Sequence, residues 1–293
     1  MYFHHYIVAK HAFTVSLPKT ERGINLTSYT PFEVDAPSHT IKPLFTLTVD
    51  DTFYPTTKGK TIGKFDCGAA DFGVYRLPDG SYQILISPPG GQYCGLLQAN
   101  PDFSQGTIAT RGQDSLRTFA VNNALMLMFA FASATKDTLL IHSSVIKNSG
   151  YGYLFLGQSG TGKSTHSNLW LKHIEGSELL NDDNPVIVVD DKGATVYGSP
   201  WSGKTPCYKN DSARIGAFVR ILQKPENRIM REQPLQAFAT LLPSMSTMKW
   251  DKRVYDGVCD SVSHLVATVP LFTLGCRPDQ EAAEVCHAEV TKR

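Results

Sequence analysis

The sequence predicts an α/β protein with a β-rich N-terminal region. Three observations support this fold class. Residues 1–112 carry short alternating or apolar runs separated by turn residues, which is typical of strands. Residues 113–293 mix such runs with longer helix-like segments, as α/β domains do. Hydrophobic residues make up 42% of the 293 positions, enough for a packed core.

The N-terminal region, residues 1–112, is expected to form a domain of its own. Residues 13–17 and 44–49 alternate or run apolar in the manner of strands. Residues 73–77 and 82–86 are predicted to form a hairpin that turns at Asp79-Gly80. This region carries no recognisable catalytic motif, so the sequence assigns it no role.

The second region, residues 113–293, is expected to alternate strands and helices. The predicted helices are residues 116–132, 163–174, 234–242, 254–268 and 279–289. The predicted strands are residues 138–147, 151–157, 178–181, 186–190, 194–198, 215–223 and 270–275. No linker rich in Pro, Ser or Gly marks the boundary between the two regions.

Charge and composition exclude several classes of partner. The chain has 28 basic and 27 acidic residues, so it lacks the positive footprint of a protein that binds nucleic acid or an anionic membrane. The longest dense apolar run, residues 124–132, is far shorter than the roughly 20 residues of a membrane span. The six cysteines are scattered, which favours free thiols. We therefore expect a cytoplasmic protein.

Residues 157–165 read GQSGTGKST and match the phosphate-binding pattern G-x-x-x-x-G-K-[ST]. Glycines allow the backbone to wrap a phosphate, and the following helix directs its positive end at the anion. A chance Gly-rich turn is the alternative, but an apolar strand precedes the motif and a helix follows it. The predicted binding residues for ATP with Mg²⁺ are Gly157, Gln158, Ser159, Gly160, Thr161, Gly162, Lys163, Ser164 and Thr165.

An acidic pair, Asp182-Asp183, follows the predicted strand 178–181. A right-handed crossover returns this strand beside the strand of the loop, so the pair faces the nucleotide. One carboxylate can hold magnesium while the other accepts a proton from an attacking hydroxyl. A solvated turn is the alternative, which Asn184-Pro185 would support.

Two further side chains are candidates. A hairpin about Ser149 would place His142 opposite Leu156, beside the mouth of the loop, where it could contact phosphate, a metal or the acceptor. Otherwise it is a histidine satisfied within the sheet. Lys204 stands among small residues and could approach a transferred phosphoryl group, or be an ordinary surface lysine. Candidates for a clamping arginine are Arg214, Arg228 and Arg231.

The set of His142, the loop GQSGTGKST and Asp182-Asp183 resembles the catalytic domain of HPr kinase/phosphorylase. It is also similar to the nucleotide site of ATP-dependent phosphoenolpyruvate carboxykinase. The resemblance covers residues 138–204 by motif. It implies a mixed-sheet P-loop kinase fold of the phosphoenolpyruvate carboxykinase-like type.

The resemblance also implies roles for single residues. Lys163 would bind phosphates and Ser164 would bind magnesium. Asp182 would act as the base and Asp183 would help to hold the metal. His142 would lie in the active site, or ligate a metal as in the carboxykinases. The kinase family's later glutamate-bearing signature has no match here, and the carboxykinases are far longer than this chain.

The sequence as a whole predicts an ATP- and Mg²⁺-dependent kinase that transfers the γ-phosphoryl group to a hydroxyl acceptor. That acceptor is a serine of a carrier protein or peptide, or a small metabolite. The alternatives are a nucleotide-responsive binding module with little catalysis and a carboxykinase-like enzyme. The acceptor, a phosphorylase activity and a homo-oligomeric state are left open.

Overall fold

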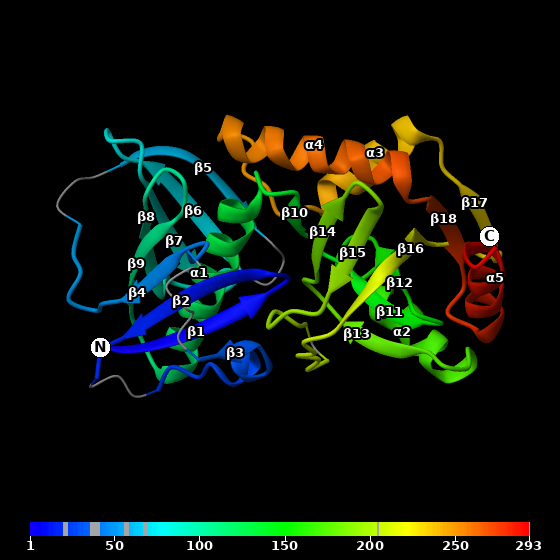
Figure 1. Cartoon of the computed structure of the whole chain (residues 1–293), viewed down its shortest axis with the longest axis horizontal. Coiled ribbons are helices and arrows are strands. Elements are labelled where there is room, and N and C mark those ends of the chain that lie inside the picture. The colour runs from blue at the N-terminus through cyan, green and yellow to red at the C-terminus, as the bar shows by residue number, and fades with distance from the viewer. Residues whose placement is uncertain (20–22, 36–41, 56–58, 67–69, 204, 293) are drawn as a thin grey trace. The chain divides into compact units, whose positions relative to one another are not determined.

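The structure is a computed structural model that describes residues 1–19, 23–35, 42–55, 59–66, 70–203 and 205–292. The chain divides into two compact units, Met1–Ser133 and Ala134–Arg293. Each unit has its own mixed sheet and its own helices, so the protein is of the mixed α/β class (Figure 1). The two units are described separately below.

Unit 1 is built on a nine-stranded sheet with the order β3-β1-β2-β4-β9-β8-β7-β6-β5. Its strands are β1 (Tyr2–Val8), β2 (His11–Leu17), β3 (Glu33–Val34), β4 (Thr46–Val49), β5 (Lys60–Asp66), β6 (Asp71–Arg76), β7 (Tyr82–Ser87), β8 (Gly95–Ala99) and β9 (Gln105–Thr110). Strand β4 runs parallel to β2 and β9, and the other neighbours are antiparallel. The predicted hairpin is present as β6 and β7.

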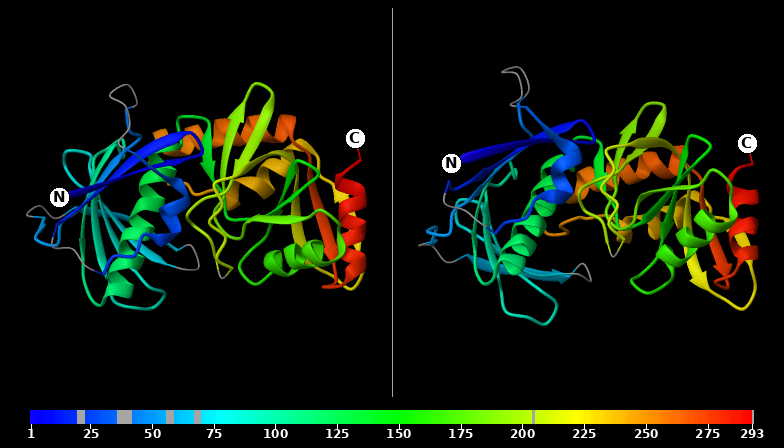
Figure 2. Two further views of the ribbon diagram at one scale, coloured as in Figure 1. Left: turned by 60° about the horizontal axis from the view of Figure 1, so that its bottom comes forward. Right: turned by 90° about the horizontal axis from the view of Figure 1, so that it is seen from below.

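The helix α1 (Asp114–Ser133) belongs to unit 1, although the sequence prediction gave it to the second region. The reason is packing, because α1 lies against β4, β7, β8 and β9 (Figure 2). Among the described helices, α1 alone is long and apolar enough to cross a membrane. Of its apolar window, 67% is buried in the structure.

Unit 2 is built on a second nine-stranded sheet, with the order β10-β14-β15-β16-β12-β11-β13 and with β18 joining β16 to β17. Its strands are β10 (Thr138–Leu140), β11 (Ser144–Asn148), β12 (Tyr151–Leu156), β13 (Glu178–Asn181), β14 (Val186–Asp190), β15 (Gly193–Tyr197), β16 (Ser212–Gln223), β17 (Arg228–Arg231) and β18 (Leu271–Cys276). The pairs β12–β16 and β16–β18 are parallel, and the others are antiparallel.

Four helices complete unit 2, namely α2 (Lys163–His173), α3 (Pro234–Leu241), α4 (Lys252–Thr268) and α5 (Gln280–Val290). One face of the sheet forms a buried core with α2 and α5, centred on the fully buried Trp170 of α2. Helix α4 packs against β10, β14 and β15. The carboxylates of Asp251 and Asp279 accept backbone N–H groups and so begin α4 and α5.

The predicted strand 138–147 is wrong as a single strand. It is two strands, β10 and β11, which pair with different neighbours. Between them, the N–H of His142 donates to Ser244 O and the N–H of Ser143 donates to Asp183 O. The break occurs because the backbone partners of this segment come from separate parts of the chain. His142 therefore lies outside any ladder, at the carboxyl edge of the sheet.

The hairpin between β11 and β12 is present, but its predicted register is wrong by one residue. Asn148 pairs with Tyr151, so the turn consists of Ser149 and Gly150 alone. Both turn residues have positive φ, 50° and 81°, which is the two-residue turn that matches strand twist. Ser144 consequently pairs with Phe155, and His142 does not face Leu156.

The sequence prediction also omitted several strands, namely β1, β3, β5, β8, β9 and β17.

Candidate functional site

The phosphate-binding motif lies between β12 and α2, as the strand–loop–helix pattern requires. Gly162 precedes the helix with a φ of 101°, and Gly160 has a φ of 84°. A side chain at either position would be strained, and a Cβ at Gly160 would meet nothing within 4 Å. A Cβ at Gly157 would lie 2.3 Å from Thr161 Oγ1. These glycines leave room for a ligand against the backbone.

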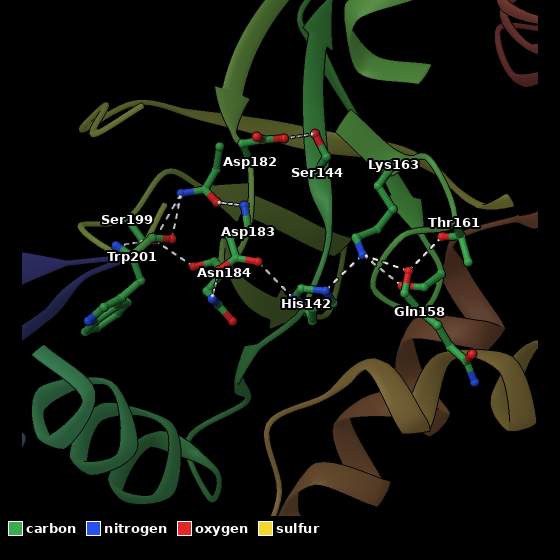
Figure 3. A network of polar contacts seen from close by, with 12 residues as sticks. His142, Ser144, Gln158, Thr161, Lys163, Asp182, Asp183, Asn184, Ser199 and Trp201 are labelled. Carbon is green, nitrogen blue, oxygen red and sulfur yellow. Dashed lines mark hydrogen bonds and ion pairs between the residues drawn. The ribbon is translucent and has the colours of Figure 1, made fainter. Parts of the chain in front are cut away.

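Lys163 is the first residue of α2 and is buried, with 8% of its surface exposed. Its ammonium group donates to Gly157 O at 2.9 Å and contacts Gln158 O at 3.4 Å (Figure 3). Burial lowers the pKa of Lys163, and the carboxylates of Asp183 and Asp182 oppose that shift. The ammonium thus lies at the mouth of the loop, within the field of the acidic pair.

His142 joins the loop to the acidic pair. Its Nε2 lies 2.9 Å from Lys163 Nζ, and its Nδ1 lies 3.0 Å from Asp183 Oδ1 (Figure 3). Because an ammonium can only donate, Nε2 accepts and Nδ1 carries the proton that it donates to Asp183. One continuous series of polar contacts therefore runs from Lys163 through the imidazole of His142 to Asp183.

Asp182 points to the other side, towards α2. It is 6% exposed, and Ser144 Oγ donates to its Oδ1 at 2.9 Å. Ser144 Oγ also lies 2.6 Å from Ser167 Oγ, on α2. Both serine side chains are buried. The carboxylate is thus held through one oxygen by Ser144 (Figure 3), and the hydroxyl of Ser144 in turn contacts that of Ser167.

The backbone around the acidic pair is held by the segment that follows β15. Asn181 Oδ1 accepts from the N–H of Asp183 at 2.9 Å, and its amide donates to Ser199 Oγ at 3.1 Å. Trp201 O accepts from the N–H of Asn184. These bonds therefore hold the backbone that carries the acidic pair. Lys204, predicted to lie nearby, is outside the described residues.

The structure brings together only part of the predicted set. Lys163, His142 and Asp183 are linked by successive side-chain contacts, and Asp182 lies beside them. The remaining loop side chains are exposed or partly exposed. These residues are Gln158, Ser159, Thr161, Ser164 and Thr165.

Sequence analysis missed Ser144 and Ser167, which complete the site. Both sit in ordinary strand and helix patterns, so only three-dimensional pairing reveals them.

Of the candidate arginines, Arg214 forms an ion pair away from the candidate site. Its guanidinium pairs with Asp190 at 3.1 Å, near the start of β16. Arg228 and Arg231 are exposed on β17, a strand that pairs with β18.

Oxygen donors suited to Mg²⁺ are present in this region. The Ser164 hydroxyl and the two carboxylates are the hard ligands that this ion prefers, usually alongside water and phosphate oxygens. The described residues include no group of three or more His, Cys, Asp and Glu placed to hold a metal by themselves. The donor set thus fits an ion shared with a polyphosphate.

In comparisons with known proteins, no family model matches the chain and no curated protein matches it significantly. The resemblance to HPr kinase/phosphorylase therefore remains a prediction that rests on the motifs.

Proposed function

We propose that unit 2 is an ATP- and Mg²⁺-dependent kinase of the P-loop, phosphoenolpyruvate carboxykinase-like type. It transfers the γ-phosphoryl group to a hydroxyl on a protein, a peptide or a small metabolite. One observation carries the proposal: the ammonium of Lys163 lies 2.9 Å from both the loop carbonyl of Gly157 and the imidazole of His142, which meets Asp183. The phosphate-binding loop and Asp183 thus meet at one point, with Asp182 adjacent in the sequence.

In the proposed reaction, the acceptor oxygen attacks the γ-phosphorus and the bond to the bridging oxygen breaks, so that ADP leaves. The acceptor proton passes to Asp182, whose carboxylate is held in place by Ser144. Lys163 exchanges its loop carbonyls for phosphate oxygens. Ser164 and Asp183 would hold magnesium, which would neutralise charge on the phosphate oxygens.

The proposal is tested with γ-labelled ATP and a cell extract separated into protein and small-molecule fractions. Label in the protein fraction identifies a protein or peptide acceptor, and label in the metabolites identifies a small one. Lys163→Ala is expected to abolish turnover. Asp182→Asn is expected to retain nucleotide affinity while the transfer rate falls by about 100-fold or more.

Three results would contradict the proposal. Transfer by Asp182→Asn at the parent rate would remove its role as base. Nucleotide binding without any labelled product would favour a binding module. ADP production that depends on oxaloacetate would indicate a carboxykinase.

We further propose a cytoplasmic location. The described cysteines are all free thiols, and most are buried. This pattern suits a reducing compartment. A cell fractionation that recovers the protein outside the cytoplasm would overturn this proposal.

A further inference from the structure

Strand β16 ends alongside the phosphate-binding loop. Its Arg220 pairs in parallel with Leu156, the residue just before Gly157. A Cβ at Gly157 would lie 3.5 Å from Ile221 O, and Gln223 Nε2 donates to Gly160 O at 3.4 Å. The last residues of β16 therefore run beside the loop from its first glycine onward.

The side chain of Arg220 lies on the face of the sheet opposite α2 and α5. Its neighbours Val219 and Ile221 belong to the buried core that contains Trp170 of α2. Because successive side chains of a strand alternate between faces, Arg220 points away from that core. His142 lies at the same sheet edge, just before β11, which is two strands away from β16.

Arg220 is a partly buried residue whose guanidinium has no anionic partner among the described residues. In the described part of the chain it makes neither a hydrogen bond nor an ion pair. Glu232, which directly follows β17, is engaged elsewhere, since its two carboxylate oxygens accept from Thr273 and Thr240. A partly buried cation without a counter-ion, beside a phosphate-binding loop, is placed to receive an anionic ligand.

We propose that Arg220 binds the terminal phosphoryl group of the nucleotide from the side opposite α2. This inference rests on the proposed function and names a further catalytic residue for it. Lys163 and the loop amides reach the phosphates from the side of α2, whereas Arg220 approaches from across β12. A planar guanidinium can donate to two phosphoryl oxygens at once, where charge is redistributed during transfer.

The test compares affinities for ADP and for the β,γ-imido analogue of ATP, both in excess Mg²⁺, by calorimetry. Arg220→Gln is expected to bind the analogue about 10- to 100-fold more weakly and ADP unchanged, since only the analogue carries the terminal group. Arg220→Lys keeps the positive charge but not the two parallel N–H donors of the guanidinium. It is expected to lose less affinity for the analogue than Arg220→Gln. It also provides a folded variant if the Gln variant is unstable.

Arg214→Gln is the matched control, because Arg214 lies near the start of the same strand in an exposed ion pair. Its affinities for both nucleotides should equal those of the parent.

Equal losses for both nucleotides in Arg220→Gln, or none, would overturn the inference while leaving the proposed function intact. Slower phosphoryl transfer with both nucleotide affinities retained would also overturn the inference. It would indicate that Arg220 contacts the acceptor and not the nucleotide. A parent protein that binds neither nucleotide would end the proposed function, and this inference with it.

Discussion

At the scale of single residues, His166 is the buried titratable group with the clearest consequence. Its Nε2 accepts from Trp170 Nε1 at 3.2 Å, and its ring lies edge-on to Phe155 with centroids 4.7 Å apart. Its Nδ1 has no partner among the described residues. Burial lowers the pKa of His166 from 6.5 to about 4. The folded protein therefore holds this imidazole neutral.

This shift predicts a pH-dependent stability. Between pH 6.5 and 4 the unfolded chain protonates His166 and the folded chain does not, so the free energy of unfolding falls as the pH is lowered. The full loss is on the order of 3 kcal/mol. Urea unfolding from pH 7 to 4, without nucleotide or divalent cation, measures it. His166→Gln should flatten the profile, and two parallel profiles would refute the assignment.

At the scale of elements, a chain of hydroxyl groups ties α2 and β11 to the end of β13. Ser167 belongs to α2, Ser144 begins β11, and Asp182 directly follows β13. The distances of 2.6 Å and 2.9 Å make it continuous. The carboxylate that the proposed reaction uses is therefore anchored to the helix that begins at the phosphate-binding loop.

Removing the two hydroxyl groups separately should have unequal costs. Ser144→Ala leaves a buried carboxylate without its donor and should destabilise the protein by about 1.5 to 3 kcal/mol. Ser167→Ala preserves the bond to Asp182 and serves as the control, at about 0.5 to 1.5 kcal/mol. Urea denaturation at pH 7 gives both values. If the two variants lost equal stability, the bond from Ser144 to Asp182 would not be the anchor.

Local patterns allowed most elements of unit 2 to be predicted. Apolar runs located β12 and β14, and glycines before a helix located the loop. The break at His142 could not be predicted, because it depends on Ser244 and Asp183, which are distant in the sequence. Register likewise depends on the backbone of Ser149 and Gly150 rather than on composition.

The site could be predicted where its functional residues are consecutive in the sequence, as in the loop and in Asp182-Asp183. It was not predictable where an ordinary residue acquires its role through pairing. Ser144 and Arg220 each lie in an apolar strand pattern, and only the strand order brings them beside the loop. The missed residues are thus those whose neighbours come from other strands.

At the scale of the whole molecule, the described residues of the candidate site all lie in unit 2. Unit 1 has its own sheet and buries its own aromatic core around Phe13, Phe45 and Phe129. A ligand bound at this site is therefore expected to stabilise first the elements of unit 2 that carry the binding residues.

Nucleotide binding is expected to slow backbone hydrogen exchange in unit 2. At 100 times the dissociation constant, a ligand adds about 2.7 kcal/mol to the unit that binds it. Protection should be largest at residues 157–165 and around Asp182, while β6 and β7 of unit 1 exchange as before. Mass spectrometry with and without ATP analogue and Mg²⁺ measures this, with Lys163→Ala as the unprotected control. Protection concentrated in β6 and β7 would place the nucleotide in unit 1 and remove the phosphate-binding loop from the binding site.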